Sequence, residues 1–145
     1  MKYSTRVSDA VHILAFIALD PKGSLSSGSI AESIHTNPGC VRQLMSSLRK
    51  ADLLFSIKGH PKPALTRQPS AITLLDVYKA VEGEKPLLHL DTHTNPECGV
   101  GIYIQLSLQD YFDQIQAKAE EEMQKITLQD ILDRYRKKLL SGCQF

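Results

Sequence analysis

The fold of this chain is decided by residues 27–67, which read SGSIAESIHTNPGCVRQLMSSLRKADLLFSIKGHPKPALTR. Ser26 or Ser27 can cap a short helix, because a serine side chain accepts a hydrogen bond from a free amide of the first turn. Asn37 can cap a second helix, and Pro38 suits its first position because the missing amide hydrogen would have no partner there. The stretch therefore predicts two short helices joined by a tight turn.

The helix that begins at Pro38 has one apolar and one polar side. Its apolar residues recur every three or four positions, which is the spacing of a single helix face. Any surface helix shows such a division, but its place after a short helix and a tight turn is typical of a recognition helix. The apolar side is formed by Val41, Leu44, Leu48 and Ala51, and the polar side by Gly39, Arg42, Gln43, Ser46 and Lys50.

A β-hairpin is predicted directly after this helix. Residues 54–58 suit a strand, and residues 59–62 contain the glycine and proline that favour a turn. The prolines also weaken the return strand, which we expect to pair only at Leu65 and Thr66. The predicted fold class is therefore mainly α with a small β-wing, a winged helix-turn-helix. The wing carries Lys58, His60 and Lys62.

Two similar segments predict two further helices. Thr73 is followed after three residues by Asp76, and Thr127 by Asp130, an aspartate version of the capping box. We expect Gly83 to end the first of these helices in the left-handed conformation. Because the surrounding residues differ, the two segments are not interpreted as a structural repeat.

The long helix predicted for residues 99–124 has an apolar stripe that a small winged domain cannot cover. The stripe spans ~35 Å at 1.5 Å per residue. We expect it to pack against the same helix of a second subunit, since a two-fold dimer uses one surface twice. The stripe consists of Val100, Ile104, Leu108, Tyr111, Ile115, Ala119 and Met123.

The predicted elements divide the chain into three segments. Residues 1–83 form the winged helix-turn-helix, residues 84–98 a polar linker or sensor loop, and residues 99–145 the dimerisation helix and a C-terminal helix. The first 67 residues carry nine Lys and Arg against four Asp and Glu, whereas the rest carry eight against twelve. A basic first half favours DNA as a partner, although chance clustering on a solvated surface is the alternative.

Composition also bears on the compartment. The longest apolar stretch, residues 11–19, is shorter than the ~20 residues of a membrane span. No signal peptide is recognised. The three cysteines, Cys40, Cys98 and Cys143, are odd in number and widely spaced, which argues against a disulfide framework. We expect a cytoplasmic protein without a membrane partner.

The order of elements resembles the Rrf2 family of bacterial winged-helix regulators, the IscR, NsrR and CymR type. The resemblance is carried by residues 1–8 (MKYSTRVS), 29–34 (SIAESI) and, most specifically, 72–83 (ITLLDVYKAVEG). Residues 36–38 (TNP) and 95–98 (NPEC) extend it to the YwnA-like members, which hold no cluster. The resemblance covers nearly the whole chain.

This resemblance implies a homodimer that binds a palindromic operator in double-stranded DNA. The recognition helix would enter the major groove and the wing would cover the backbone or minor groove, although Lys62-Pro63 replaces the glycine pair common in the family's wings. Iron–sulfur members place three cysteines in the linker and at the start of the dimer helix. This chain has only Cys98 there, with Thr92 and Ile104 at the other positions, so neither a cluster nor another cofactor is expected.

The chemistry of the side chains suggests how DNA would be contacted. Arg42 can pair with guanine and Gln43 with adenine through two hydrogen bonds each, so these residues are expected to read bases. Ser46 and Asn37 could reach a phosphate or a base, but Asn37 could equally act only as a helix cap. The other basic residues are expected to contact phosphates and supply affinity rather than sequence choice. They are Lys2, Arg6, Lys50, Lys58 and Lys62, with His60 beside them on the wing and a merely solvated Lys50 as an alternative.

Cys98 is a candidate redox sensor. It falls at the predicted N-terminus of the long helix, where the helix dipole favours a thiolate. A buried cysteine without chemistry is the alternative, and Cys40 is interpreted as a small packing residue. His89 and His93 are metal-ligating types near Cys98, but their spacing matches no closed zinc motif and no metal site is predicted.

Two other classes of function compete with a regulator. An enzyme is not expected, since the sequence has no nucleophile elbow, no glycine-rich phosphate loop and no suitable Cys/His/Asp arrangement. A winged-helix module that binds another protein is the second alternative. Affinity for duplex DNA that falls steeply with salt would distinguish a DNA binder from such a module. The sequence as a whole favours a DNA-binding transcriptional repressor.

Overall fold

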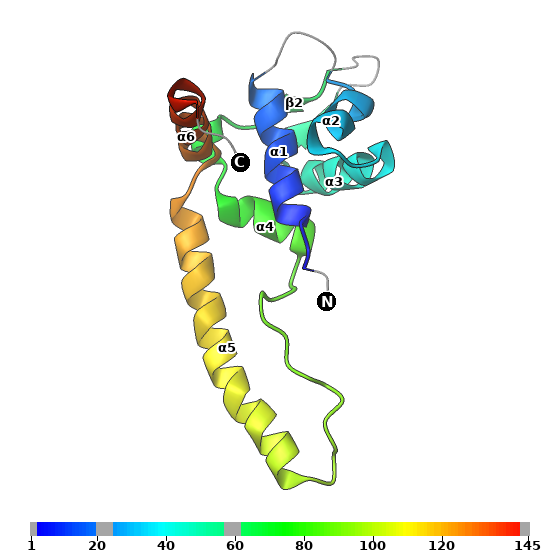
Figure 1. Cartoon of the computed structure of the whole chain (residues 1–145), viewed down its shortest axis with the longest axis vertical. Coiled ribbons are helices and arrows are strands. Elements are labelled where there is room, and N and C mark those ends of the chain that lie inside the picture. Colours follow the sequence, from blue (N-terminus) through cyan, green and yellow to red (C-terminus); the bar gives the residue numbers. More distant parts are fainter. Residues whose placement is uncertain (1–2, 20–24, 57–61, 143–145) are drawn as a thin grey trace.

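The computed structural model describes residues 3–19, 25–56 and 62–142. The predicted mainly helical fold with a small antiparallel sheet is confirmed. Most elements gather at one end of the molecule, and one long helix extends away from them (Figure 1). The elements are α1 (Arg6–Leu19), α2 (Ser27–Ile34), α3 (Pro38–Lys50), β1 (Leu54–Phe55), β2 (Ala64–Leu65), a 3₁₀ turn η1 (Pro69–Ala71), α4 (Leu74–Glu82), α5 (Gly99–Lys125) and α6 (Leu128–Ser141).

The hydrophobic core joins α1, α3 and α4, and α6 contributes to it. Ile13 of α1, Leu48 of α3 and Ile72 before α4 are fully buried. Leu128 and Leu132 of α6 belong to the same core and are 1% and 3% exposed. The predicted segment 99–145 therefore has two parts, because α6 packs on the winged domain and α5 does not join its core. We call α1 to α4, the sheet and α6 the winged domain.

The helix-turn-helix is fixed by two side-chain caps and one left-handed residue. Ser26, rather than Ser27, caps α2, and its hydroxyl accepts a hydrogen bond from the amide three residues on. Asn37 caps α3 in the same way, at 2.9 Å, as predicted. Between the helices His35 adopts φ 67° and ψ 49°, which reverses the chain within a few residues. The position of α3 therefore follows from local hydrogen bonds that the sequence encodes.

The wing pairs two short strands, with Leu54 opposite Leu65 and Phe55 opposite Ala64. The predicted pairing is confirmed at Leu65, but the strand begins one residue earlier, at Ala64, and ends before Thr66, whose amide still donates to the Leu53 carbonyl at 3.4 Å. A proline precedes Ala64, but it lacks only its own amide hydrogen, so pairing can begin at the next residue.

The two capping boxes form as predicted, and they also lie against each other. In each, the threonine hydroxyl accepts from the aspartate amide and the aspartate carboxylate accepts from the threonine amide. Thr73 and Thr127 form an isolated antiparallel bridge, with a backbone hydrogen bond of 2.8 Å on either side. This bridge joins the starts of α4 and α6. The similarity of the two capping segments in the sequence did not predict that they would be in contact.

Gly83 ends α4, but not in the predicted conformation. Its φ of 61° is positive, whereas its ψ of −125° lies outside the left-handed helical region. Glycine reaches this region because it has no Cβ. The amide of Gly83 still donates to the Lys79 carbonyl at 3.1 Å, which closes the last turn.

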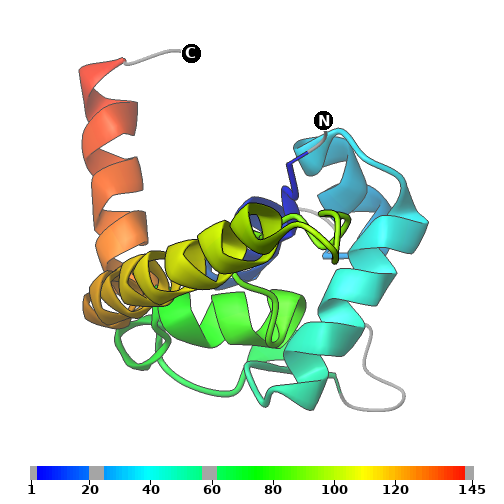
Figure 2. The same ribbon diagram turned by 90° about the horizontal axis from the view of Figure 1, so that it is seen from below.

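Residues 84–98 lead away from the winged domain as a linker without helix or strand, and α5 returns beside this linker (Figure 1). None of the 27 residues of α5 is buried. Among the described residues, no helix combines the length and apolar character needed to cross a bilayer. Seen from below, α6 and α3 lie on opposite sides of α1 and α4 (Figure 2).

Candidate nucleic-acid interface

Helix α3 turns one side inward and leaves the other in solvent, as predicted. Val41 and Leu48 are fully buried, and Leu44 is 4% exposed. Met45, which the apolar pattern did not include, is buried with them. Because this side anchors α3 to the core, the opposite side has a fixed orientation.

The outward side of α3 is polar and basic. Arg42, Gln43 and Lys50 are exposed, and Ser46 is half-buried. Arg49 is also exposed, although the sequence interpretation did not include it. Arg49 follows Arg42 by seven residues, which is two helical turns, so the two arginines lie on the same side. That spacing was the signal available in the sequence.

The first turn of α3 combines structural and exposed groups. The side-chain oxygen of Asn37 accepts a hydrogen bond from the Cys40 amide, so Asn37 acts as a helix cap. Asn37 is itself exposed, and a contact with DNA stays a prediction. Cys40 is exposed, so the interpretation of this residue as a packing cysteine is wrong. The buried side of α3 begins only at Val41, one position later.

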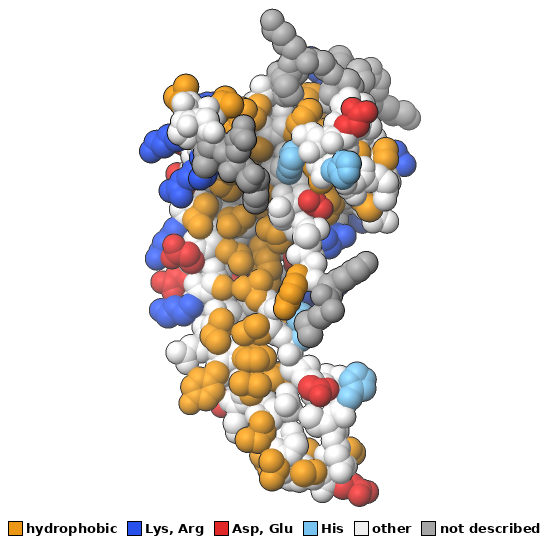
Figure 3. Space-filling model, in the orientation of Figure 1, with side chains coloured by type: hydrophobic (Ala, Val, Ile, Leu, Met, Phe, Trp, Pro, Cys, Tyr) orange, Lys and Arg blue, Asp and Glu red, His pale blue; other side chains and the backbone are white. Residues whose placement is uncertain are grey.

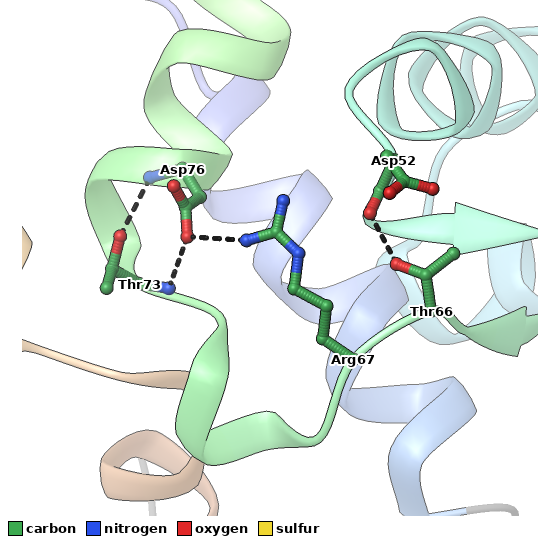
Figure 4. Close-up of polar contacts among 5 residues, drawn as sticks. All are labelled: Asp52, Thr66, Arg67, Thr73 and Asp76. Carbon is green, nitrogen blue, oxygen red and sulfur yellow. Dashed lines mark hydrogen bonds and ion pairs between the residues drawn. The ribbon is translucent and has the colours of Figure 1, made fainter.

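The base of the wing is held from two directions (Figure 4). The Thr66 hydroxyl donates to the carbonyl of Asp52, just after α3. The guanidinium of Arg67 pairs with the carboxylate of Asp76 at 3.3 Å, and this carboxylate also completes the capping box of α4. The wing therefore leaves the domain from a base fixed to the end of α3 and the start of α4.

Only part of the predicted wing contact set falls within the described residues. Lys62 is exposed two residues before β2 begins. Lys58 and His60 lie outside the described residues, as does Lys2 near the N-terminus. Arg6 begins α1, and its Nε donates to the Val81 carbonyl of α4 at 3.0 Å. Arg6 thus joins two helices, and its contact with phosphate stays a prediction.

Helix α5 presents a long apolar surface that the described part of the chain leaves uncovered. Ile104, Tyr111 and Ile115 of the predicted dimer stripe are 57%, 65% and 49% exposed. Leu108 and Met123 are half-buried. Figure 3 shows hydrophobic side chains in a continuous band over α5. Val100 of the stripe is exposed as well, and Tyr103 and Leu106 add further exposed apolar side chains to this helix.

Cys98 stands at the start of α5. It is the N-cap residue, its side chain makes no capping hydrogen bond, and its thiol is exposed. The alternative of a buried cysteine is therefore wrong. His89 and His93 are also exposed in the linker, and His93 lies 3.7 Å from the Asp91 carboxylate.

The capped helix-turn-helix, the anchored wing and the exposed basic side of α3 define a winged helix-turn-helix protein. The sequence of residues 3–134 matches the Rrf2 family, which is described as an iron-dependent transcriptional regulator. The chain therefore belongs to the Rrf2 family of transcriptional regulators, and the resemblance seen in its sequence is confirmed.

Three known proteins show how far the similarity extends. YwnA of Bacillus subtilis (strain 168), provisionally named an HTH-type transcriptional regulator, is 39% identical over 130 residues, or 90% of this chain and 96% of YwnA. The structure of CymR, the global cysteine regulator of B. subtilis, gives a TM-score of 0.64 at 26% identity and covers 90% of this chain and 95% of CymR. The structure of T. potens IscR gives a TM-score of 0.66 at 25% identity and covers 93% of this chain and 88% of IscR.

The residues present do not fit the iron–sulfur cluster that the resemblance associates with other members of the family. Such clusters are held mainly by cysteine thiolates. Cys98 has Thr92 and Ile104 at the neighbouring family positions, and neither side chain can supply a thiolate. In the parts of the chain that the structure covers, no three His, Cys, Asp or Glu residues gather as a metal site.

Proposed function

We propose that this chain is a homodimeric repressor that recognises a palindromic operator in double-stranded DNA. The observation that carries the proposal is the orientation of α3, which buries Val41 and Leu48 and turns Arg42 and Gln43 to solvent. A helix held in this way can lie in the major groove without unfolding any part of the domain.

Arg42 and Gln43 are the residues proposed to read bases. Bidentate pairing of Arg with guanine or Gln with adenine gives ~1–3 kcal/mol of discrimination each. Arg49, Lys50 and Lys62 are proposed to contact phosphates, which supply affinity but no sequence choice. Arg6, Lys2, Lys58, His60, Ser46 and Asn37 complete the proposed interface.

The proposed dimer forms through the apolar side of α5. A two-fold axis would place the stripe of one subunit against that of the other and cover both. It would also present two copies of α3 to two half-sites, which explains the palindrome. Repression needs nothing further, because a dimer bound over an operator excludes other proteins from the same DNA.

We further propose that Cys98 senses peroxide. The proposed regulator is cytoplasmic, holds no cluster and catalyses no reaction on a substrate. The thiolate attacks one peroxide oxygen, the O–O bond breaks, and sulfenic acid and hydroxide form; sulfur loses the two electrons that peroxide gains. An exposed thiol at a helix N-terminus is suited to this step. Modification there would act at the junction of linker and α5.

Selection of binding sites from random duplexes tests DNA binding, because a dimer should enrich inverted half-sites. On the selected duplex, Arg42→Ala should weaken binding by about 10- to 100-fold, which corresponds to ~1–3 kcal/mol. Arg134→Ala is the matched control, since Arg134 is exposed on α6, on the far side of the domain from α3. Equal loss in both variants, or affinity that does not fall with salt, would favour the protein-interaction module instead.

The thiol proposal has its own matched pair, because Cys40 and Cys98 are both exposed and free. Peroxide should lower operator affinity in the wild type and in Cys40→Ser, but not in Cys98→Ser. If only Cys40→Ser becomes insensitive, the sensor is the cysteine on the recognition helix and the proposal for Cys98 is wrong.

A further inference from the structure

A cavity of about 500 Å³ lies between the linker and one side of α5. Small-molecule sites usually measure about 300–1,000 Å³, so this volume suits a small organic molecule. Its walls are formed by linker residues between 84 and 92, by Lys79 of α4, and by α5 residues between Gln109 and Glu120. None of these residues belongs to the proposed interface with DNA.

The cavity presents charges of both signs beside an apolar wall. Lys85 and Glu84 of the linker and Asp113 of α5 line it, and none of them forms an ion pair with another described side chain. Asp113 accepts a hydrogen bond from the Gln109 side chain at 2.5 Å, and Glu84 adds to the effect of Glu120 in raising the pKa of Lys79. Phe112 and Leu88 supply apolar surface. A simple anion would meet Glu84 and Asp113, and a simple cation would meet Lys85. A molecule with one ammonium, one carboxylate and an apolar side chain matches all three features.

The polar wall of the cavity and the centre of the proposed dimer stripe lie on different sides of α5. Successive residues of an α-helix are rotated by about 100°, so Tyr111 lies about 200° around α5 from Gln109. Gln109, Asp113 and Gln116 line the cavity, whereas Tyr111 and Ile115 belong to the exposed apolar stripe. The polar wall of the cavity therefore lies away from Tyr111, whereas Phe112 lies at the border between the cavity and the stripe, next to Leu108.

Gln116 connects the wall of the cavity to the winged domain. Its side-chain oxygen accepts from the Leu87 amide at 2.8 Å, and its nitrogen donates to the Tyr78 hydroxyl at 3.1 Å. The Tyr78 hydroxyl in turn donates to the Lys85 carbonyl. One side chain thus holds the linker, α4 and α5 together, and we call this network the Gln116 clasp.

An ion pair reinforces the clasp at the same wall. Lys79 of α4 lies 2.9 Å from the Glu120 carboxylate of α5, and both residues line the cavity. Their hydrogen bond raises the pKa of Lys79 and lowers the pKa of Glu120. Glu120 also accepts from the Gln116 amide at 3.1 Å. An occupant of the cavity would therefore touch the contacts that set the position of α4 relative to α5.

We propose that this cavity binds a free α-amino acid with an apolar side chain, and that its occupancy changes operator affinity through the Gln116 clasp. The ammonium lies toward Glu84 and Asp113, the carboxylate toward Lys85, and the side chain against Phe112. The regulatory part rests on the proposed DNA-binding function, whereas the binding site itself does not.

Titration calorimetry on the DNA-free protein tests the site, with each standard L-amino acid as the probe. At least one apolar amino acid should bind with a Kd below about 1 mM. Asp113→Asn should abolish that binding, while Asp110→Asn, an exposed change on α5 outside the cavity, should not. For L-leucine, 4-methylpentanoate lacks the ammonium and 3-methylbutylamine the carboxylate, so neither should bind. Absence of binding by every amino acid, or equal binding by either analogue, overturns the site.

Operator binding then tests the coupling. A saturating amount of the bound amino acid should change the operator Kd by about 5- to 150-fold in the wild type and leave Asp113→Asn unaffected. Unchanged affinity in the wild type overturns the regulatory part. Failure of the wild type to bind any duplex overturns the proposed function instead, and the calorimetry still decides whether the site exists.

Discussion

Helices α3 and α5 are both amphipathic, but only α3 buries its apolar side within the fold. The 13-residue α3 buries four side chains within its own chain, whereas the 27-residue α5 buries none. The apolar side of α3 is satisfied by the fold, so its polar side is free for a partner. The apolar side of α5 is left exposed, so its polar side can serve the linker and the cavity. The exposed polar side of α3 is therefore expected to bind DNA, and the exposed apolar side of α5 is expected to bind a second subunit.

Matched truncations should show the largest difference between the two helices. Leu48 of α3 is fully buried and Leu106 of α5 is 57% exposed. Leu48→Ala should lower the free energy of unfolding by about 2–5 kcal/mol, because it removes buried surface and leaves a cavity. Leu106→Ala should cost less than about 0.5 kcal/mol, because Leu106 follows Ile104 by two residues and so lies about 200° around α5 from the stripe proposed to form the dimer. Urea denaturation of both variants measures this, and similar costs would remove the contrast.

The stripe on α5 should make stability depend on protein concentration. If two copies of α5 cover each other, the midpoint of thermal unfolding should rise with concentration, because association stabilises the folded state. Ile104→Asp should remove this dependence by placing a charge in the apolar contact. Sedimentation should then show a monomer at micromolar concentration. A wild type that is monomeric under these conditions would leave the α5 surface to another partner.

The paired capping boxes join the starts of α4 and α6 and should contribute less. Thr73→Ala and Thr127→Ala should each cost ~1 kcal/mol, the usual value of a lost cap. Because the two threonines form a bridge, the double variant should depart from the sum by more than about 0.5 kcal/mol. Additive costs in denaturation would show that the bridge does not couple the caps.

Local rules predicted the helix caps and the helix-turn-helix well. Asn37, Thr73 and Thr127 were recognised as caps from the residues within one turn of each, and the structure contains all three. The two buried and exposed sides of α3 also follow from spacing alone. Arg49 was missed because the sequence interpretation did not consider that it lies two helical turns, or seven residues, after Arg42 on the same side of α3.

Contacts between distant residues could not be predicted in this way. The bridge between Thr73 and Thr127 can be predicted only when the direction of α5, which connects them, is known. The Gln116 clasp joins Gln116 to residues 29 and 38 positions before it. The assignment of α6 to the winged domain likewise depends on Leu128 and Leu132 meeting a core built from the first half of the chain. No local pattern records which surface such residues will meet.

The smallest predicted effect concerns pH at the contact between α4 and α5. The pKa of Glu120 is lowered from 4.5 by its hydrogen bond with Lys79, so its contribution to stability is present above pH 4.5 and is lost as pH falls through the lowered value. The pKa of Lys79 is raised from 10.5, so its contribution is present below pH 10.5 and is lost as pH rises through the raised value.

Both groups are partly exposed, so solvent screens the pair and the change should be small. Glu120→Gln should reduce stability between these limits and leave it unchanged at the acidic end, where the carboxylate of the wild type is protonated. Urea unfolding at a series of pH values measures the difference. In a Lys79→Met background, Glu120→Gln should have a smaller effect. An equal effect in both backgrounds would mean that Gln116, not Lys79, is the partner through which α5 holds α4.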